Sequence, residues 1–144
     1  MARLELDGFD DLNAALNRIG TIPEPITVKA LDAMAAVAAE KIRASGESMG
    51  VRDPESPVHI LDVIKPTKPK TDADGGYEDI TFAGTRLRSG KRVRNAEIAF
   101  INEYGSRHQQ ARPFIGQAMT QNEAAIAAPG AEIIGDWIEK EFSE

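Results

Sequence analysis

The sequence predicts an α+β fold in which a small antiparallel sheet of about three to four strands packs on a long amphipathic helix, with further helices toward the N-terminus and the C-terminus. Apolar residues recur at steps of three and four over residues 27–45, which is the period of one helix face. Short segments rich in β-branched residues follow over residues 59–83, separated by proline and glycine. Helical periodicity then returns toward residue 142, and this segregation favours α+β over alternating βαβ units.

The bulk properties are those of one soluble domain spanning residues 1–144. Hydrophobic residues make up 42% and charged residues 28% of the chain, which is ordinary for a globular protein. The absence of cysteine excludes disulfide bonds, thiolate nucleophiles and cysteine-ligated metals. Apolar runs are too short for a signal peptide or a bilayer span. We therefore expect a soluble protein made in the cytoplasm, without a membrane partner.

The first half of the chain is predicted to be mainly helical. Within residues 1–20, alternating leucines and charges predict a short strand or arm, and spaced leucines then predict a helix that stops at Gly20. The strongest helix prediction covers residues 27–45, with Gly46 as its stop. The apolar stripe of this helix consists of Val28, Leu31, Ala35, Ala38 and Ile42.

The middle of the chain is predicted to hold the strands. Glycine, serine and proline over residues 46–58 predict a flexible loop. Residues 59–65 read as a strand that ends, or lies at a sheet edge, because prolines follow it. Residues 72–76 (DADGG) predict a turn, and the alternation over residues 77–83 predicts a second strand.

A basic stretch over residues 84–94 is expected to form a flexible loop or the tip of a hairpin. The net charge of the whole chain is −6, yet this stretch contains no acidic residue. It is either an ordinary solvated surface or a contact for a polyanion or an acidic partner. No aromatic residues are interleaved, so any DNA contact would be to the backbone and independent of sequence. The basic residues are Arg86, Arg88, Lys91, Arg92 and Arg94.

Helices are predicted for the remainder of the chain. Residues 96–104 fit a short helix or a strand, and we favour a strand around residues 91–95 that passes into a short helix. Helix should follow from residue 113 to residue 142, with Pro129 either kinking one helix or separating two. Its second part should turn inward Ile133, Ile134, Trp137 and Ile138. Acidic residues 132–144 give the chain an end that can attract the basic stretch of a neighbouring copy.

The chain offers no constellation of catalytic or metal-binding residues. His59 and His108 are far apart in sequence, and the spacings typical of zinc and calcium sites are absent. Residues 84–92 differ from a phosphate-binding loop in spacing and lack its hydroxyl residue. No nucleophile elbow occurs. We therefore predict that the protein is not an enzyme and uses no cofactor and no metal.

Residues 99–119 (AFINEYGSRHQQARPFIGQAM) are the most informative segment. Gly105 follows apolar residues and can adopt backbone conformations that other residues avoid. Residues 106–110 are all polar and suit an exposed, mobile loop, and Pro113 fits the first turn of a helix. The side chains expected on one face of that helix are Phe114, Ala118 and Met119.

Two half-motifs in this segment carry a family resemblance. Glu103-Tyr104-Gly105-Ser106 and Ala111-Arg112-Pro113-Phe114 resemble the "E-[FY]-G-[ST] … A-R-P-F" signature of tail-completion proteins of long-tailed bacteriophages, also described as head–tail joining or neck proteins and minor tail components. The opening LELDGFDDLNAALNRI also resembles the start of that family. One departure is that residues 56–61 (SPVHIL) lack the Thr-Gly pair of the family's "P-V-x-T-G-x-L" segment.

The resemblance implies a structural virion protein that assembles as a ring, typically a hexamer, at the phage neck or tail end and joins tail to head. It implies contact with its own copies and with other neck and tail proteins, and a location in the virion after assembly in the host cytoplasm. Under this resemblance Glu103, Tyr104 and Gly105 shape the turn, Arg112 is available for an ion pair, and Pro113 and Phe114 start and anchor the last helix. Candidate interface residues are Arg86, Arg88, Lys91, Arg92, Arg94, Arg107 and His108. The alternative is a nucleic-acid-binding regulatory module that uses the basic residues 86–94.

Overall fold

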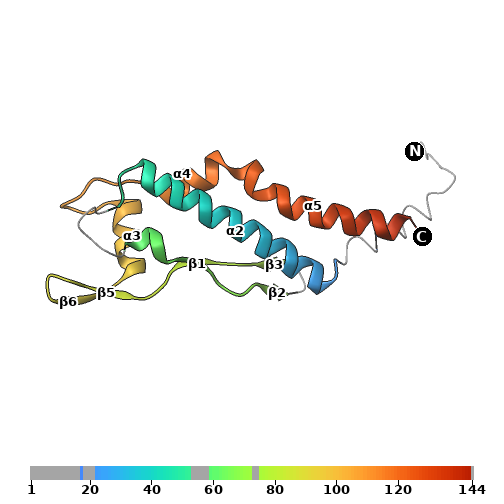
Figure 1. The fold of residues 1–144 in the computed structure, drawn as a ribbon, viewed down its shortest axis with the longest axis horizontal. Helices are drawn as coiled ribbons and strands as arrows, with labels where there is room; N and C mark the ends of the chain where they lie inside the picture. Colours follow the sequence, from blue (N-terminus) through green and yellow to red (C-terminus); the bar gives the residue numbers. More distant parts are fainter. Residues whose placement is uncertain (1–16, 18–21, 53–58, 73–74, 144) are drawn as a thin grey trace, which may run out of the picture.

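Figure 1 shows the fold in a computed structural model, which describes residues 17, 22–52, 59–72 and 75–143. The predicted N-terminal arm and most of the helix predicted to precede Gly20 therefore fall outside the described residues. The predicted α+β class is confirmed, with one long helix among helices and short antiparallel strands. The strands do not form one sheet of three to four strands, because they pair as three separate two-stranded ribbons.

The long helix α2 spans Glu24–Ser48, so it starts and ends three residues beyond the predicted bounds. The prediction that Gly46 stops it was wrong, since Gly46 is buried inside the helix. The stop is Gly50, with φ of +73°: its N–H donates to the Glu47 carbonyl, and the Val51 N–H donates to the Gly46 carbonyl. These two bonds form a Schellman motif, which requires a positive φ at that residue. The predicted loop over residues 46–58 therefore begins only after the helix, and residues 53–58 lie outside the described residues.

A long ribbon follows, preceded by the short 3-10 helix η1 (Ile60–Val63). Strand β1 (Ile64–Pro66) pairs with β4 (Ile80–Phe82), and β2 (Lys70–Asp72) pairs with β3 (Gly75–Tyr77). The strand predicted over residues 59–65 is therefore wrong before Ile64, and the one predicted over residues 77–83 is split. Three residues between β1 and β2 face two between β3 and β4, because Pro66 pairs with Ile80 while Lys70 pairs with Tyr77. Such a bulge is where a sheet accommodates proline.

The basic stretch forms a regular hairpin rather than a flexible loop. Strand β5 (Thr85–Arg88) pairs with β6 (Lys91–Arg94), so the predicted alternative of a hairpin is confirmed, with Ser89-Gly90 at its tip. Both tip residues have positive φ, 51° and 78°, as a type I′ turn requires. Helix α3 (Asn95–Tyr104) follows β6 directly, so the favoured prediction of a strand passing into a short helix is confirmed.

The C-terminal part contains α4 (Phe114–Gln121) and α5 (Glu123–Phe142). The helix breaks at Asn122, where φ is −120° and the side-chain amide donates to the Ala118 carbonyl, and not at Pro129. Pro129 lies inside α5. Proline has no N–H, so Pro129 cannot donate to the Ala125 carbonyl one turn earlier. Ala125 is exposed, and water can hydrogen-bond to that carbonyl instead. The apolar residues predicted to point inward in the second part of α5 are half-buried.

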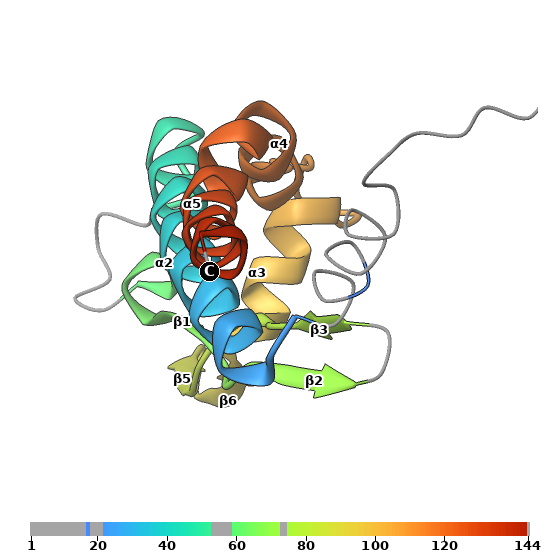
Figure 2. The same ribbon diagram turned by 90° about the vertical axis from the view of Figure 1, so that its right-hand side faces the viewer.

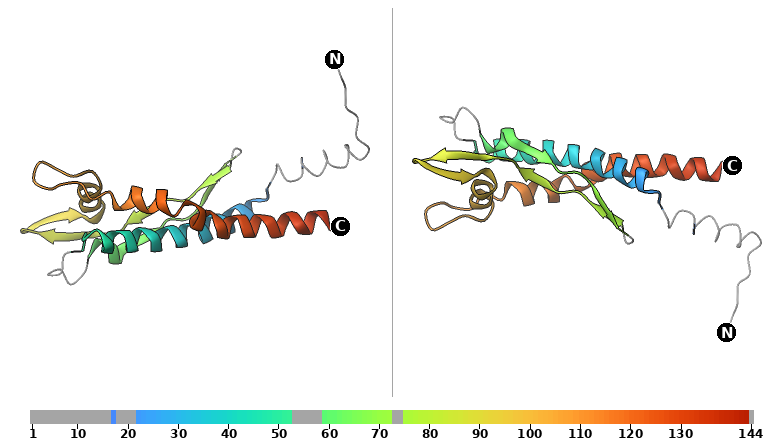
Figure 3. Two further views of the ribbon diagram at one scale, coloured as in Figure 1. Left: turned by 90° about the horizontal axis from the view of Figure 1, so that it is seen from above. Right: turned by 90° about the horizontal axis from the view of Figure 1, so that it is seen from below.

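The helices and the ribbons form two layers. Helices α2, α4 and α5 lie on one side and the ribbons on the other, and α5 runs antiparallel to α2 (Figures 1 and 2). Figure 3 shows an elongated molecule with the β5–β6 hairpin and the α3–α4 loop at one end and the end of α5 at the other. The main core consists of Ala39, Ile42, Val51, Ile60, Leu61, Ile64, Phe82, Ile98, Ala99, Phe114 and Ala118.

Candidate functional site

The two half-motifs fold into one unit made of α3, α4 and the loop between them. The Glu103 carboxylate, near the end of α3, accepts the backbone N–H of Ile115 at Oε2 (2.8 Å) and that of Gly116 at Oε1 (2.9 Å). These are the second and third residues of α4, whose N-terminal N–H groups have no partners within the helix. Pro113 at the N-cap gives no side-chain hydrogen bond, so Glu103 caps α4 from the preceding helix.

Gly116 contributes to this cap, although the sequence pattern did not single it out. A Cβ at this position would lie 3.0 Å from the Glu103 Oε1 atom. A larger residue would therefore press on the oxygen that accepts its own N–H. Glycine is unfavourable inside a helix, and no chain reversal requires one at position 116. A glycine in the first helical turn is therefore the signal that could have identified Gly116.

Removing the cap gives a stability prediction. Glu103→Ala should lower the free energy of unfolding by about 1–2 kcal/mol, because two N–H groups lose their acceptor and a negative charge leaves the helix N-terminus. Glu97→Ala, in the same helix, is the control, since among the described residues its carboxylate contacts Arg94 alone, in an exposed ion pair at 3.2 Å. We expect that control to cost less than about 0.5 kcal/mol in urea unfolding. Equal losses for the two variants would contradict the capping role.

The loop after α3 is closed by backbone bonds at its base. Gly105 ends α3 with φ of 79° and ψ of 176°, and its N–H donates to the Ile101 carbonyl at 2.7 Å. Ser106 and Gln109 exchange backbone hydrogen bonds of 2.8 and 3.3 Å. The predicted interface residues Arg107 and His108 lie between them at the exposed tip. Loop residues 106–110 are thus displayed on a defined turn.

A buried amide fixes this loop to α3. Asn102 is 7% exposed, and its side chain accepts from the Gln109 side chain (2.9 Å) while donating to the Ile98 carbonyl (2.9 Å). The Asn102 carbonyl also accepts the backbone N–H of Arg112 (2.6 Å). Sequence reasoning missed Asn102 and Gln109, because an asparagine in a helix and a glutamine in a polar loop carry no distinguishing pattern.

Arg112 ties the loop to the end of the long helix. Its Nη1 donates to the Gly50 carbonyl at 2.8 Å, across 62 positions of sequence. The resemblance had suggested an ion pair for this residue, whereas its contact among the described residues is with this backbone carbonyl. Arg112 as a whole is exposed to solvent.

Phe114 lies at the centre of the core and is fully buried. Its ring meets Phe82 edge-on, with centroids 5.9 Å apart at 72°. Ala118, one turn later, is also buried, but Met119 is 42% exposed, so its expected place on the inner face was wrong. Met119 is five positions after Phe114, and at about 100° per residue it points to a different side of the helix.

Tyr104 belongs to the first half-motif but points to the surface. It is 69% exposed and lies against Phe100, itself 60% exposed, with ring centroids 4.7 Å apart. Both line a groove of about 380 Å³ together with Phe82, Ala99 and Ile115 among others. Exposed aromatic residues beside an apolar groove are typical of protein-binding surfaces.

The two faces of the β5–β6 hairpin differ in their contacts. Thr85, Arg92 and Arg94 lie on one face of the hairpin. On that face Arg92 donates to the Thr85 hydroxyl (3.0 Å), and Arg94 pairs with Glu97 of α3 (3.2 Å). Arg86, Arg88 and Lys91 belong to the other face, since directly paired residues share a face. On that face Arg86 donates to the Asn95 side chain at 2.8 Å.

A basic cleft of about 320 Å³ lies between this second face, the end of α2 and the α3–α4 loop. Its lining residues come from five stretches of the chain, at 50–52, 59, 86–88, 98–102 and 109–112, and only some of them were predicted as site residues. Its apolar lining residues are Val51, Leu87, Ile98 and Ile101, and its arginines are Arg52, Arg86, Arg88 and Arg112. Leu87 pairs directly with Arg92, so its side chain belongs to the first face of the hairpin. None of the described residues that line it is an aspartate or a glutamate. The predicted interface residues Arg86 and Arg88 thus lie near Arg112, while Arg92 and Arg94 do not line this cleft.

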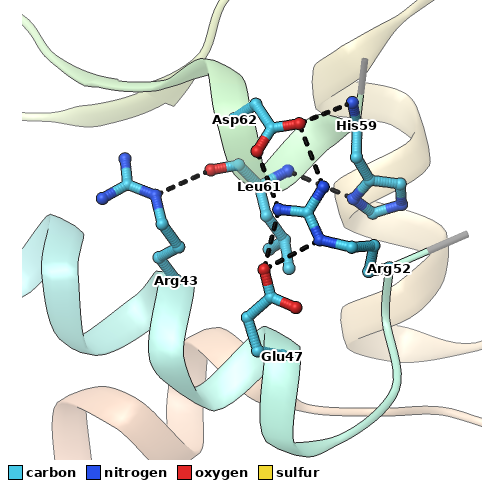
Figure 4. A network of polar contacts seen from close by, with 6 residues as sticks. All are labelled: Arg43, Glu47, Arg52, His59, Leu61 and Asp62. Carbon is cyan, nitrogen blue, oxygen red and sulfur yellow. Dashed lines mark hydrogen bonds and ion pairs between the residues drawn. The ribbon is translucent and has the colours of Figure 1, made fainter. Parts of the chain in front are cut away.

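Arg52 is held in place by acidic side chains (Figure 4). It binds both oxygens of Asp62 (2.7 and 3.1 Å) and the Glu47 carboxylate (2.8 Å). These bonds, with the N–H of His59, hold the pKa of Asp62 well below its usual range. His59 is buried, and its Nδ1 accepts the Leu61 N–H at 3.3 Å, so this histidine caps η1. The network therefore has a structural role, connecting the end of α2 to η1. The Arg52 guanidinium is already neutralised by Asp62 and Glu47.

A second carboxyl group, Glu78, has a pKa shifted in the opposite direction. Burial of this side chain and its contact with the Asp32 carboxylate raise the pKa of Glu78 to about 7. The Glu78 carboxyl therefore keeps its proton longer in the folded state than in the unfolded chain. Its contribution to stability is complete below pH 4.5, the ordinary pKa of glutamate, and is lost as the pH rises through about 7.

This shift predicts a pH dependence. The wild-type melting temperature should fall between pH 5 and pH 8, and Glu78→Gln should flatten that fall because the amide cannot ionise. Asp79→Asn, which changes the exposed neighbouring carboxylate, is the control and should keep the wild-type slope. A Glu78→Gln profile parallel to wild type would contradict the assignment.

The described part of the chain holds no group of three or more His, Asp or Glu side chains that could bind a metal ion. No helix in the same part is both long and apolar enough to cross a bilayer. The geometry around residues 99–119 thus provides caps, packing and displayed side chains. Comparison of the chain with protein-family models, curated proteins and solved structures finds no match.

Proposed function

We propose that the protein is a structural component of a bacteriophage virion that assembles as a ring at the neck or tail end and joins the tail to the head. The observation that carries the proposal is the union of the two half-motifs into one unit. Glu103 of the first half caps the helix that Phe114 of the second half anchors. The spacing between the half-motifs thus lets Glu103 reach the N-terminus of α4. It also holds the loop over residues 106–110 exposed between the two helices, where a partner can bind it.

The distribution of charge supports self-assembly. The basic hairpin lies at one end of the elongated molecule, and the acidic last turns of α5 lie at the other (Figure 3). Contacts between unlike ends are heterologous, and such contacts close into a ring when the rotation between subunits fits. The exposed Phe100–Tyr104 pair offers a further surface, to which we assign the other neck and tail proteins as partners.

Deleting the gene from the phage or prophage that carries it tests the proposal. Electron micrographs of the particles should then show filled heads and tails that remain unattached. Supplying the wild-type protein from a plasmid should restore tailed particles. Normal, infectious tailed particles from the deletion would refute the role in joining.

Nucleic-acid binding by the β5–β6 hairpin is the second candidate. Arg88 and Lys91 flank the turn and are exposed, which suits contact with a phosphate backbone. The net charge of −6 opposes such binding. Tight, salt-sensitive binding of duplex DNA by the free protein would favour this candidate, and its loss in a Lys91→Glu variant would locate the contact.

A further inference from the structure

The basic cleft contains cationic groups that the chain itself does not neutralise. Arg88 makes no side-chain hydrogen bond or ion pair within the described residues. Arg112 donates to a neutral carbonyl and has no acidic partner there. Guanidinium groups gathered in one cleft repel one another, and an anion placed among them relieves this repulsion.

The opposite end of the molecule has complementary chemistry. Glu139 and Glu141 lie in the last turns of α5 on either side of Lys140, and Glu141 is followed by Phe142, which is 51% exposed. Carboxylates near the C-terminus of a helix add to the negative end of its dipole, so this end favours a cationic partner. The α5 end thus carries negative charge, whereas the cleft at the other end of the molecule carries positive charge.

We infer that the cleft receives the last turns of α5 from a second copy of this chain, with Arg88 and Arg112 binding Glu139 and Glu141. This inference rests on the proposed function, because it specifies the contact between subunits in the ring. It also explains why the hairpin is rigidly built. The type I′ turn and the bond from Arg86 to Asn95 hold its inner face over the cleft.

Two variants separate the halves of this contact. Arg88→Glu removes the receiving side, and the double variant Glu139→Gln with Glu141→Gln removes the charge of the inserted side without offering a cationic partner to Arg88→Glu. Each variant alone should self-associate roughly tenfold or more weakly than wild type in sedimentation velocity at low ionic strength. When the two are mixed, the intact cleft of one still accepts the intact α5 end of the other. The mixture should therefore form a complex of one copy of each and nothing larger.

Arg92→Glu is the matched control, because it makes the same charge change on the opposite face of the same hairpin. It should associate as wild type does, and circular dichroism should show all variants folded. Loss of association in Arg92→Glu equal to that in Arg88→Glu, or a mixture that stays monomeric, would overturn the inference. Arg88→Glu that abolishes DNA binding while leaving self-association intact would assign the cleft to nucleic acid instead.

The outcome is distinguishable from failure of the proposed function. Wild-type protein that self-associates regardless of Arg88→Glu removes this contact but leaves the virion role to be judged by the deletion phage. Deletion particles that remain normally tailed remove the virion role, whatever the variants do in solution.

Discussion

Phe114→Ala should lower the free energy of unfolding by about 3–5 kcal/mol, the usual cost of emptying a fully buried phenylalanine site. The site cannot easily collapse around the smaller side chain. Gly46 of α2 already lies so close that a Cβ there would be 3.2 Å from the Phe114 ring, and Phe82 meets the ring edge-on. For a chain of this size the melting temperature should fall by roughly 10 °C.

Met119→Ala is the matched control for this prediction. It shortens a large apolar side chain on the same helix, but Met119 is 42% exposed and should cost less than about 1 kcal/mol. Both variants can be compared by urea unfolding at equal protein concentration. A Phe114→Ala melt within a degree of wild type would mean that the ring does not fill the core.

Sequence periodicity located the elements whose structure depends on local pattern. The stripe of α2 is buried at Ala35, Ala38 and Ile42, because spacing of three and four residues alone defines a helix face. The stop of α2 was misplaced, since both Gly46 and Gly50 are plausible helix ends. Packing decides between them: Gly46 is needed where a Cβ would lie 2.5 Å from the Leu61 side chain. Such contacts between distant segments are not visible in a single sequence.

In the candidate site, too, features set by the local sequence could be predicted, whereas features set by contacts between distant segments could not. The motif residues could be named from the sequence, and the turn at Gly105 follows from their order. The role of Glu103 could not be predicted, because it acts on the N-terminus of α4 only after the loop has closed. Nor could the basic cleft, since Arg52, Arg88 and Arg112 come from separate segments that tertiary folding brings together.

Gly105→Ala should destabilise the protein by about 3 kcal/mol, from backbone strain and collision together. With φ of 79° and ψ of 176°, Gly105 occupies a region that is essentially restricted to glycine. A Cβ would lie 2.8 Å from the Ala111 nitrogen and 3.1 Å from the Gln109 carbonyl oxygen. Both atoms belong to the backbone of the closed loop, so neither can move without opening it. The change should therefore also displace Glu103 from the α4 terminus.

Substitutions at two other glycines separate the contribution of backbone strain from that of steric collision. Gly50 has φ of +73°, but a Cβ there would meet nothing within 4 Å, so Gly50→Ala reports backbone strain alone. A Cβ at Gly135, within α5, also meets nothing, and Gly135→Ala should stabilise the protein by about 0.5–1 kcal/mol through helix propensity. Urea unfolding should rank Gly105→Ala as the most costly and Gly50→Ala as intermediate. Equal costs at Gly105 and Gly50 would mean that the loop yields to the added methyl group, and the closed turn would then not be what positions Arg107 and His108.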